Sequence, residues 1–181
     1  MTSTETAQKT PPLTTRRTWL KGGLASAVLL TVGGAWLARP PVAWEGGQFS
    51  ASAQAIWHAL GRALLDGTLP TEATAQTQTL AGLLDRLTAA VAALPPHAQA
   101  ELSQLLTLLG TSAGRRWLAG VDSEWSQASV AEIQAGLQAM RSSRLALRQQ
   151  AYVALHDLVG AAYFSHPSTW KVLDYPGPMD L

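Results

Sequence analysis

Four histidines, His58, His97, His156 and His166, are the side chains best suited to acid–base catalysis near neutral pH. None of them lies in an H-E-x-x-H motif or in another pair with metal-ligand spacing. His156 directly precedes Asp157, which could give a base with its orienting acid, but adjacent helix positions point roughly 100° apart. We therefore expect these histidines to be solvated or partly buried residues without a catalytic role.

The motifs of other common active sites are missing from the sequence. There is no G-x-S-x-G nucleophile elbow and no G-x-x-x-x-G-K-[ST] phosphate loop. The chain has no cysteine, so thiol catalysis, c-type haem attachment and cysteine-ligated clusters are excluded. We expect a protein without catalytic residues and without a cofactor or metal of its own.

Three arginines, Arg141, Arg144 and Arg148, are spaced at i, i+3 and i+7. They would share one face of a continuous helix, although we expect Ser142-Ser143 to interrupt it. Two interpretations remain open. The arginines form either a solvated basic face or a surface that docks an acidic partner.

Aromatic residues are the more unusual feature, because tryptophan and tyrosine dominate both protein cores and binding hot spots. We expect Trp57 and Trp117 to lie in the core. Several aromatics gather instead in a Pro-rich segment near the C-terminus, and they either fold back over the helices or face a partner. The residues that we assign to partner binding are Tyr163, Phe164, Trp170, Tyr175, Pro176, Gly177 and Pro178.

The elements that would position these residues are helices, because apolar residues recur at helical spacing between Gly and Pro punctuation. We predict an all-α fold in which residues 44–181 form a single domain of five or six helices with an irregular Pro-rich tail. The first expected helix runs from Ser50 or Ser52 to Asp66, the second from a cap at Thr71 to Pro95, and the third over His97–Leu109. A short helical turn is expected over Arg115–Ala119. A fifth helix begins at Ser129, which forms a capping box with Glu132, and a sixth runs over Leu145–Phe164. Residues 39–48, rich in Pro and Gly, are expected to be a linker.

Residues 1–43 have the features of an export signal. Arg16 and Arg17, followed by Leu20 and Lys21, match the twin-arginine motif, and residues 22–38 carry no charge and contain four glycines. Glycine lowers the hydrophobicity of this run, as is typical of twin-arginine signals. No clear small-x-small cleavage site follows. We therefore predict either a cleaved signal or an uncleaved N-terminal anchor that contacts the inner membrane, and a periplasmic location for the domain.

The charge balance changes when this segment is set apart. The chain has 13 Lys and Arg against 12 Asp and Glu, and residues 1–43 hold five basic residues and one acid. Residues 44–181 therefore hold eight basic and eleven acidic residues, a net charge of −3. A domain of this charge gives no support to nucleic-acid binding.

The twin-arginine signal, Leu94-Pro95-Pro96, the residues Arg116, Gly120 and Trp125, and the ending Ala161-Ala162-Tyr163-Phe164 … Trp170 … Tyr175-Pro176-Gly177-Pro178 resemble one known family. The chain is similar to the small, or gamma, subunits of periplasmic flavin dehydrogenases, the gluconate 2-dehydrogenase subunit 3 and sorbitol dehydrogenase small-subunit type. The likeness covers most of the chain.

This resemblance implies a non-catalytic subunit. It implies that the chain binds a large dehydrogenase of the glucose-methanol-choline class with FAD in that partner, aids its maturation and carries it through the twin-arginine translocase. Electrons would then pass to a cytochrome c subunit. The alternative that the residues leave open is a stand-alone exported helical module that binds a small ligand between its aromatic side chains.

Overall fold

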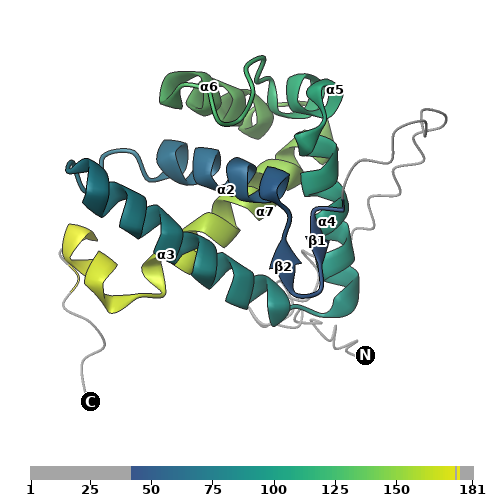
Figure 1. Ribbon diagram of the computed structural model, residues 1–181. Helices are drawn as coiled ribbons and strands as arrows, with labels where there is room; N and C mark the ends of the chain where they lie inside the picture. Colours follow the sequence, from purple (N-terminus) through teal and green to yellow (C-terminus); the bar gives the residue numbers. More distant parts are fainter. Residues whose placement is uncertain (1–41, 174, 176–181) are drawn as a thin grey trace, which may run out of the picture. The chain divides into compact units, whose positions relative to one another are not determined.

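The computed structural model describes residues 42–173 and 175, apart from the side chains of residues 171–173. This part of the chain is mostly helical, with one small sheet of two strands, which confirms the all-α fold class. Figure 1 shows the arrangement of its elements. The predicted export signal, with Arg16, Arg17, Leu20 and Lys21, lies outside the described residues.

The described chain opens with a hairpin where the sequence predicts a linker. Strands β1 (Trp44–Glu45) and β2 (Gln48–Phe49) pair antiparallel, with Trp44 opposite Phe49. Gly46 and Gly47 connect them with φ angles of 59° and 80°, a left-handed backbone that favours glycine at both turn positions. Trp44 and Phe49 are buried, with their rings 4.7 Å apart. The hairpin is therefore part of the core, and the linker prediction is wrong for residues 44–48.

Helix α2 (Ala51–Leu64) occupies the middle of the described fold. Its cap is Ser50, one of the two starting positions that the sequence leaves open, and Ile56, Trp57 and Leu60 are at most 1% exposed. It contacts α3, α4, α6 and α7, and Figure 1 shows it running between α6 and α3 with α7 behind. Full burial of an apolar side chain of this size stabilises the fold by about 1.5–3 kcal/mol, and α2 places several such side chains in the core.

Helices α3 (Ala73–Ala92) and α4 (Pro96–Gly110) lie close to their predicted ranges. The cap of α3 is Glu72, where the sequence predicts Thr71. Its carboxylate accepts hydrogen bonds from the backbone N–H groups of Thr74 and Ala75 at 2.8 and 2.6 Å. These bonds hold the pKa of Glu72 below its ordinary value. Helix α4 begins at a proline, which needs no hydrogen-bond acceptor in a first turn.

A tight bend follows α4. The single turn α5 (Ser112–Gly114) continues into a turn of π-helix, η1 (Arg115–Ala119), which ends at Gly120 with φ 71°. After a loop, α6 (Val130–Arg141) begins at the predicted Ser129 cap, whose hydroxyl accepts from the Glu132 N–H at 3.1 Å.

The last long helix, α7 (Ala146–Phe164), leads into a 3-10 helix, η2 (Pro167–Leu173). The break between α6 and α7 at residues 142–145 confirms that the three arginines do not lie on one continuous helix. Among the described residues, no helix combines the length and apolar character needed to cross a membrane.

Candidate partner-binding site

The residues assigned to partner binding begin at the C-terminal end of α7, where Tyr163 and Phe164 lie side by side with ring centroids 5.0 Å apart. Tyr163 is 2% exposed, and its hydroxyl donates to the carbonyl oxygen of Thr68 at 3.1 Å. It is therefore a core residue that ties α7 to the loop after α2, and the structure corrects its assignment to a contact surface. Phe164 is only partly buried and packs against the core from outside.

Helix η2 is held against the end of α7 by side chains that satisfy the free carbonyl groups there. The Thr169 hydroxyl lies 3.0 Å from the carbonyl oxygen of Tyr163 and 2.7 Å from that of His166. The indole N–H of Trp170 donates to the Phe164 carbonyl at 2.7 Å. The segment therefore folds back on α7, the first of the two arrangements that the sequence allows.

Folding back does not bury all of its aromatic side chains. Trp170 is half-buried, and Tyr175 is 48% exposed with its ring 5.4 Å from that of Trp170 in an edge-on arrangement. We define Phe164, Trp170 and Tyr175 as the C-terminal aromatic surface. Pro176, Gly177 and Pro178 lie outside the described residues.

The histidines are all exposed. His156 Nδ1 lies 2.9 Å from Asp157 Oδ1, so the two adjacent side chains do meet, against the sequence argument from helix geometry. Long side chains can bend toward each other from a shared surface, which the angle between Cβ directions does not capture. Both partners are more than half exposed, and an ion pair of this kind contributes little in water. His58, although exposed, is partly covered by its neighbours, and this partial burial, followed by the charge of Arg62, lowers its pKa.

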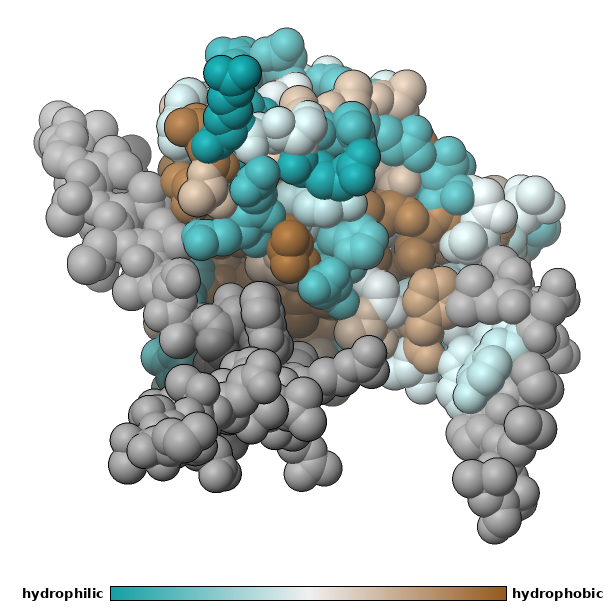
Figure 2. Space-filling view, turned by 180° about the vertical axis from the view of Figure 1, so that it is seen from behind, coloured by the Kyte–Doolittle hydropathy of each residue, from teal (hydrophilic) through white to brown (hydrophobic). Residues whose placement is uncertain are grey.

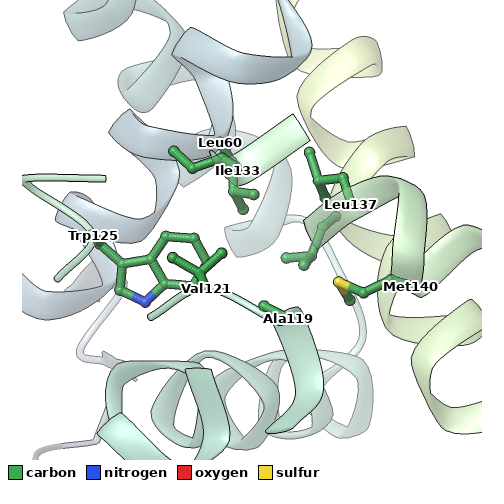
Figure 3. A pocket seen from close by; sticks show the side chains of 8 residues that line it. Leu60, Ala119, Val121, Trp125, Ile133, Leu137 and Met140 are labelled. Carbon is green, nitrogen blue, oxygen red and sulfur yellow. The ribbon is translucent and has the colours of Figure 1, made fainter. Parts of the chain in front are cut away.

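The described residues hold no group of three or more His, Cys, Asp or Glu side chains placed to bind a metal ion. Two hollows can be described. Figure 3 shows the inner one, between α2, α6, α7 and the chain after η1, with Trp125, Val121, Ile133 and Met140 pointing toward one another. Its lining is entirely apolar, and it has no room for a water molecule. It is a packed junction between elements.

The second hollow, of about 380 Å³, is open to solvent beside β1 and α4. Its polar lining is already engaged. The indole N–H of Trp44 donates to the side-chain oxygen of Gln99 at 2.9 Å, and its backbone N–H donates to the hydroxyl of Ser103 at 3.1 Å. These contacts fix the hairpin on α4 and leave few free groups with which to orient a small ligand.

Sequence reasoning missed the most buried charge of the described chain. Arg115, 2% exposed, forms a two-pronged ion pair with Glu124, with N–O distances of 2.9 and 2.7 Å. The Glu124 side chain remains 63% exposed. The pair fixes the loop between η1 and α6, and no motif signals it, because it depends on tertiary burial.

The prediction that Trp117 lies in the core is wrong. Trp117 is 56% exposed, whereas Trp57 is buried as expected. The π-turn explains the difference, because its extra residue per turn shifts the side chains away from the α-helical register. Arg115, Leu118 and Ala119 face inward, and Trp117 projects outward beside Arg116.

Comparison of the chain with models of protein families, with curated proteins and with solved structures found no match.

Proposed function

We propose that this protein is a non-catalytic small subunit that binds a large flavin-dependent dehydrogenase and carries it through the twin-arginine pathway into the periplasm. The observation that carries this proposal is the twin-arginine motif at Arg16 and Arg17, placed before an uncharged, glycine-containing run. The resemblance of the sequence to small subunits of such dehydrogenases names the partner class.

The choice of export pathway supports a role as an escort. The twin-arginine route moves proteins that are already folded, whereas a helical domain without cysteine could cross as an extended chain and fold outside. Folded export is required when a cofactor must be inserted before crossing. A large partner loaded with FAD in the cytoplasm meets this condition, and it would use the signal of the small subunit.

The C-terminal aromatic surface is the part of the described chain that we assign to this partner. Tyr and Trp supply large contact areas with few rotatable bonds, which is why they are frequent at binding hot spots. Trp170 and Tyr175 already hold one another in place, so little side-chain freedom would be lost on binding. In this proposal FAD and the catalytic residues belong to the large subunit, and electrons leave it through a cytochrome c subunit.

Affinity purification of the full chain from its native membranes tests the proposal. We expect a larger polypeptide to co-elute and the eluate to show the visible absorption bands of oxidised flavin. The double variant Trp170→Ala and Tyr175→Ala should lose most of this band, because the contact surface is removed while the core is left intact.

His97→Ala is the matched control, because His97 is also exposed but lies in the first turn of α4 and not on α7 or η2. It should retain the flavin band. A wild-type eluate with no larger polypeptide and no flavin spectrum would contradict the proposed function. Retention of the full band by the double variant would contradict only the assignment of the surface.

A further inference from the structure

A second surface stands out by its charge. Residues 44–181 carry a net charge of −3, yet between residues 116 and 148 Arg116, Arg141 and Arg144 are exposed and Arg148 is half-buried. The other arginines with described side chains make internal contacts, as Arg148 also does through its Nε atom. Arg62 donates to the carbonyl oxygen of Ala128, Arg86 to that of Ala162, and Arg115 binds Glu124.

The fold brings this stretch together from three elements. Arg148 Nε, near the start of α7, donates to the carbonyl oxygen of Leu118 in η1 at 3.0 Å. Helix α6 crosses η1 at Gly136, where a Cβ atom would come within 2.3 Å of the Ala119 carbonyl oxygen. The middle of α6, the start of α7 and the C-terminal end of η1 therefore adjoin, and Arg116 and Trp117 lie within three residues of that end.

Apolar side chains lie among these arginines. Trp117 on η1 is 56% exposed, and Leu145, one turn before Arg148, is 51% exposed. Figure 2 shows one face of the molecule, on which hydrophobic and hydrophilic residues are mixed. We define Arg116, Trp117, Arg144, Leu145 and Arg148 as the arginine–tryptophan surface.

One carboxylate interrupts the positive charge. Asp122 Oδ1 lies 3.6 Å from Arg116 Nε, and both side chains are well exposed. The nearby Glu132 carboxylate is engaged by the backbone N–H groups of Asp122 and Ser123 at 2.9 and 3.0 Å. The arginines therefore outnumber the acids that face them, and the surface complements a partner of opposite charge.

We propose that the arginine–tryptophan surface docks an acidic protein segment that also carries an apolar side chain. The guanidinium groups would bind carboxylates in a two-pronged geometry, and Trp117 with Leu145 would cover the apolar side chain. A protein fits better than a polyphosphate or nucleic acid, because the arginines are spread around apolar residues and the domain itself is acidic. The identity of the partner as the large subunit rests on the proposed function, whereas its chemistry rests on this surface alone.

A photo-crosslinking experiment tests the docking directly. The photoreactive amino acid benzoylphenylalanine replaces Trp117 in the full chain, expressed in the native host, and the adducts are mapped by mass spectrometry. We expect an adduct with an Asp- and Glu-rich segment of a different, larger polypeptide. The same probe at His97 is the control and should give no such adduct. Adducts confined to this chain or to a second copy, or no adduct, would overturn the inference.

A charge-matched pair of variants provides the second measurement. Arg116→Gln with Arg144→Gln lowers the net charge by two, as does Gln78→Glu with Ala81→Glu on exposed positions of α3. We expect the first pair to weaken retention of the large partner at low salt by about tenfold, and the second by less than about twofold. Equal effects would overturn the inference.

The two proposals fail in different ways. If the wild-type chain retains a flavoprotein that is not crosslinked from Trp117, the docking inference is lost and the proposed function stands. If Trp117 crosslinks to an acidic protein that carries no flavin, the docking surface stands and the proposed function is lost.

Discussion

Two regions of the described chain hold tryptophan in contrasting ways. Around Trp125, the loop between η1 and α6 is tied to distant elements, because the indole N–H donates to the Leu109 carbonyl at 2.8 Å and Arg62 reaches Ala128 from α2. Around Trp170, the side-chain hydrogen bonds of η2 that the structure describes reach back to residues 163, 164 and 166, at the end of α7 and just after it. The first region joins the fold together, whereas the second is anchored mainly at one helix end.

The contrast shows where the chain can change without unfolding. A segment whose bonds are local can be altered at its surface with little effect on the core, and binding residues are often found in such segments. In a loop whose hydrogen bonds reach distant elements, a substitution also disturbs the packing of the core. The four predictions below compare residues that hold distant elements together with residues whose contacts are local or exposed.

The largest effect is expected when the two tryptophans are truncated in parallel. Trp125→Ala should lower the free energy of unfolding by about 4 kcal/mol, because it opens a cavity in a fully packed junction. Trp170→Ala should cost roughly 1 kcal/mol, because its ring is only partly buried. Denaturant unfolding of both variants measures the difference. Equal losses would show that η2 is as integral to the fold as the junction.

A second comparison uses two acids of the loop. Glu124→Ala leaves Arg115 buried without its carboxylate and should destabilise the protein by about 3 kcal/mol. Asp122→Ala removes an exposed pair of 3.6 Å and should change stability by less than about 1 kcal/mol. Urea unfolding at constant ionic strength separates them, and a neutral effect of Glu124→Ala would count against the role of the ion pair.

Glycines give the third comparison. Gly136→Ala should cost about 2 kcal/mol, because its Cβ would collide with the Ala119 carbonyl oxygen and push α6 away from η1. Gly160→Ala on α7 meets nothing within 4 Å and should stabilise the helix by about 0.5–1 kcal/mol. The midpoint temperature of thermal unfolding should fall for Gly136→Ala and rise for Gly160→Ala. A shift of both midpoints in the same direction would contradict the close contact of α6 with η1 at Gly136.

The smallest effect concerns Glu132. Hydrogen bonds from Ser123, together with weaker ones from Asp122 and Ser129, lower its pKa. A lowered pKa means that the charged form stabilises the folded state above the unfolded pKa and that this contribution is lost as the pH falls through the folded value. The stability difference between wild type and Glu132→Gln should therefore be present at neutral pH and disappear on acidification. A difference that does not depend on pH would contradict this assignment.

The sequence predicts the helices well where local signals act alone. Ser50 and Ser129 precede apolar residues at helical spacing, and both are the caps observed. The hairpin was missed because Gly46-Gly47 has the composition of a linker, and only burial of Trp44 and Phe49 identifies it as structure.

The candidate site was predictable only in part. The aromatic composition points to residues 163–175, but which ring is buried depends on the tertiary contact between Tyr163 and Thr68. The exposure of Trp117 depends on one π-turn, and the pairing of Arg115 with Glu124 depends on burial. None of these has a local sequence signal.

In the proposed function, this chain carries a larger flavoprotein across the membrane. The most direct measurement is the fraction of that partner in the periplasm when Arg16 and Arg17 are both replaced by lysine, with the rest of the chain unchanged. We predict that the partner and this chain both stay in the cytoplasm. A flavoprotein that still reaches the periplasm in full amount would contradict the claim.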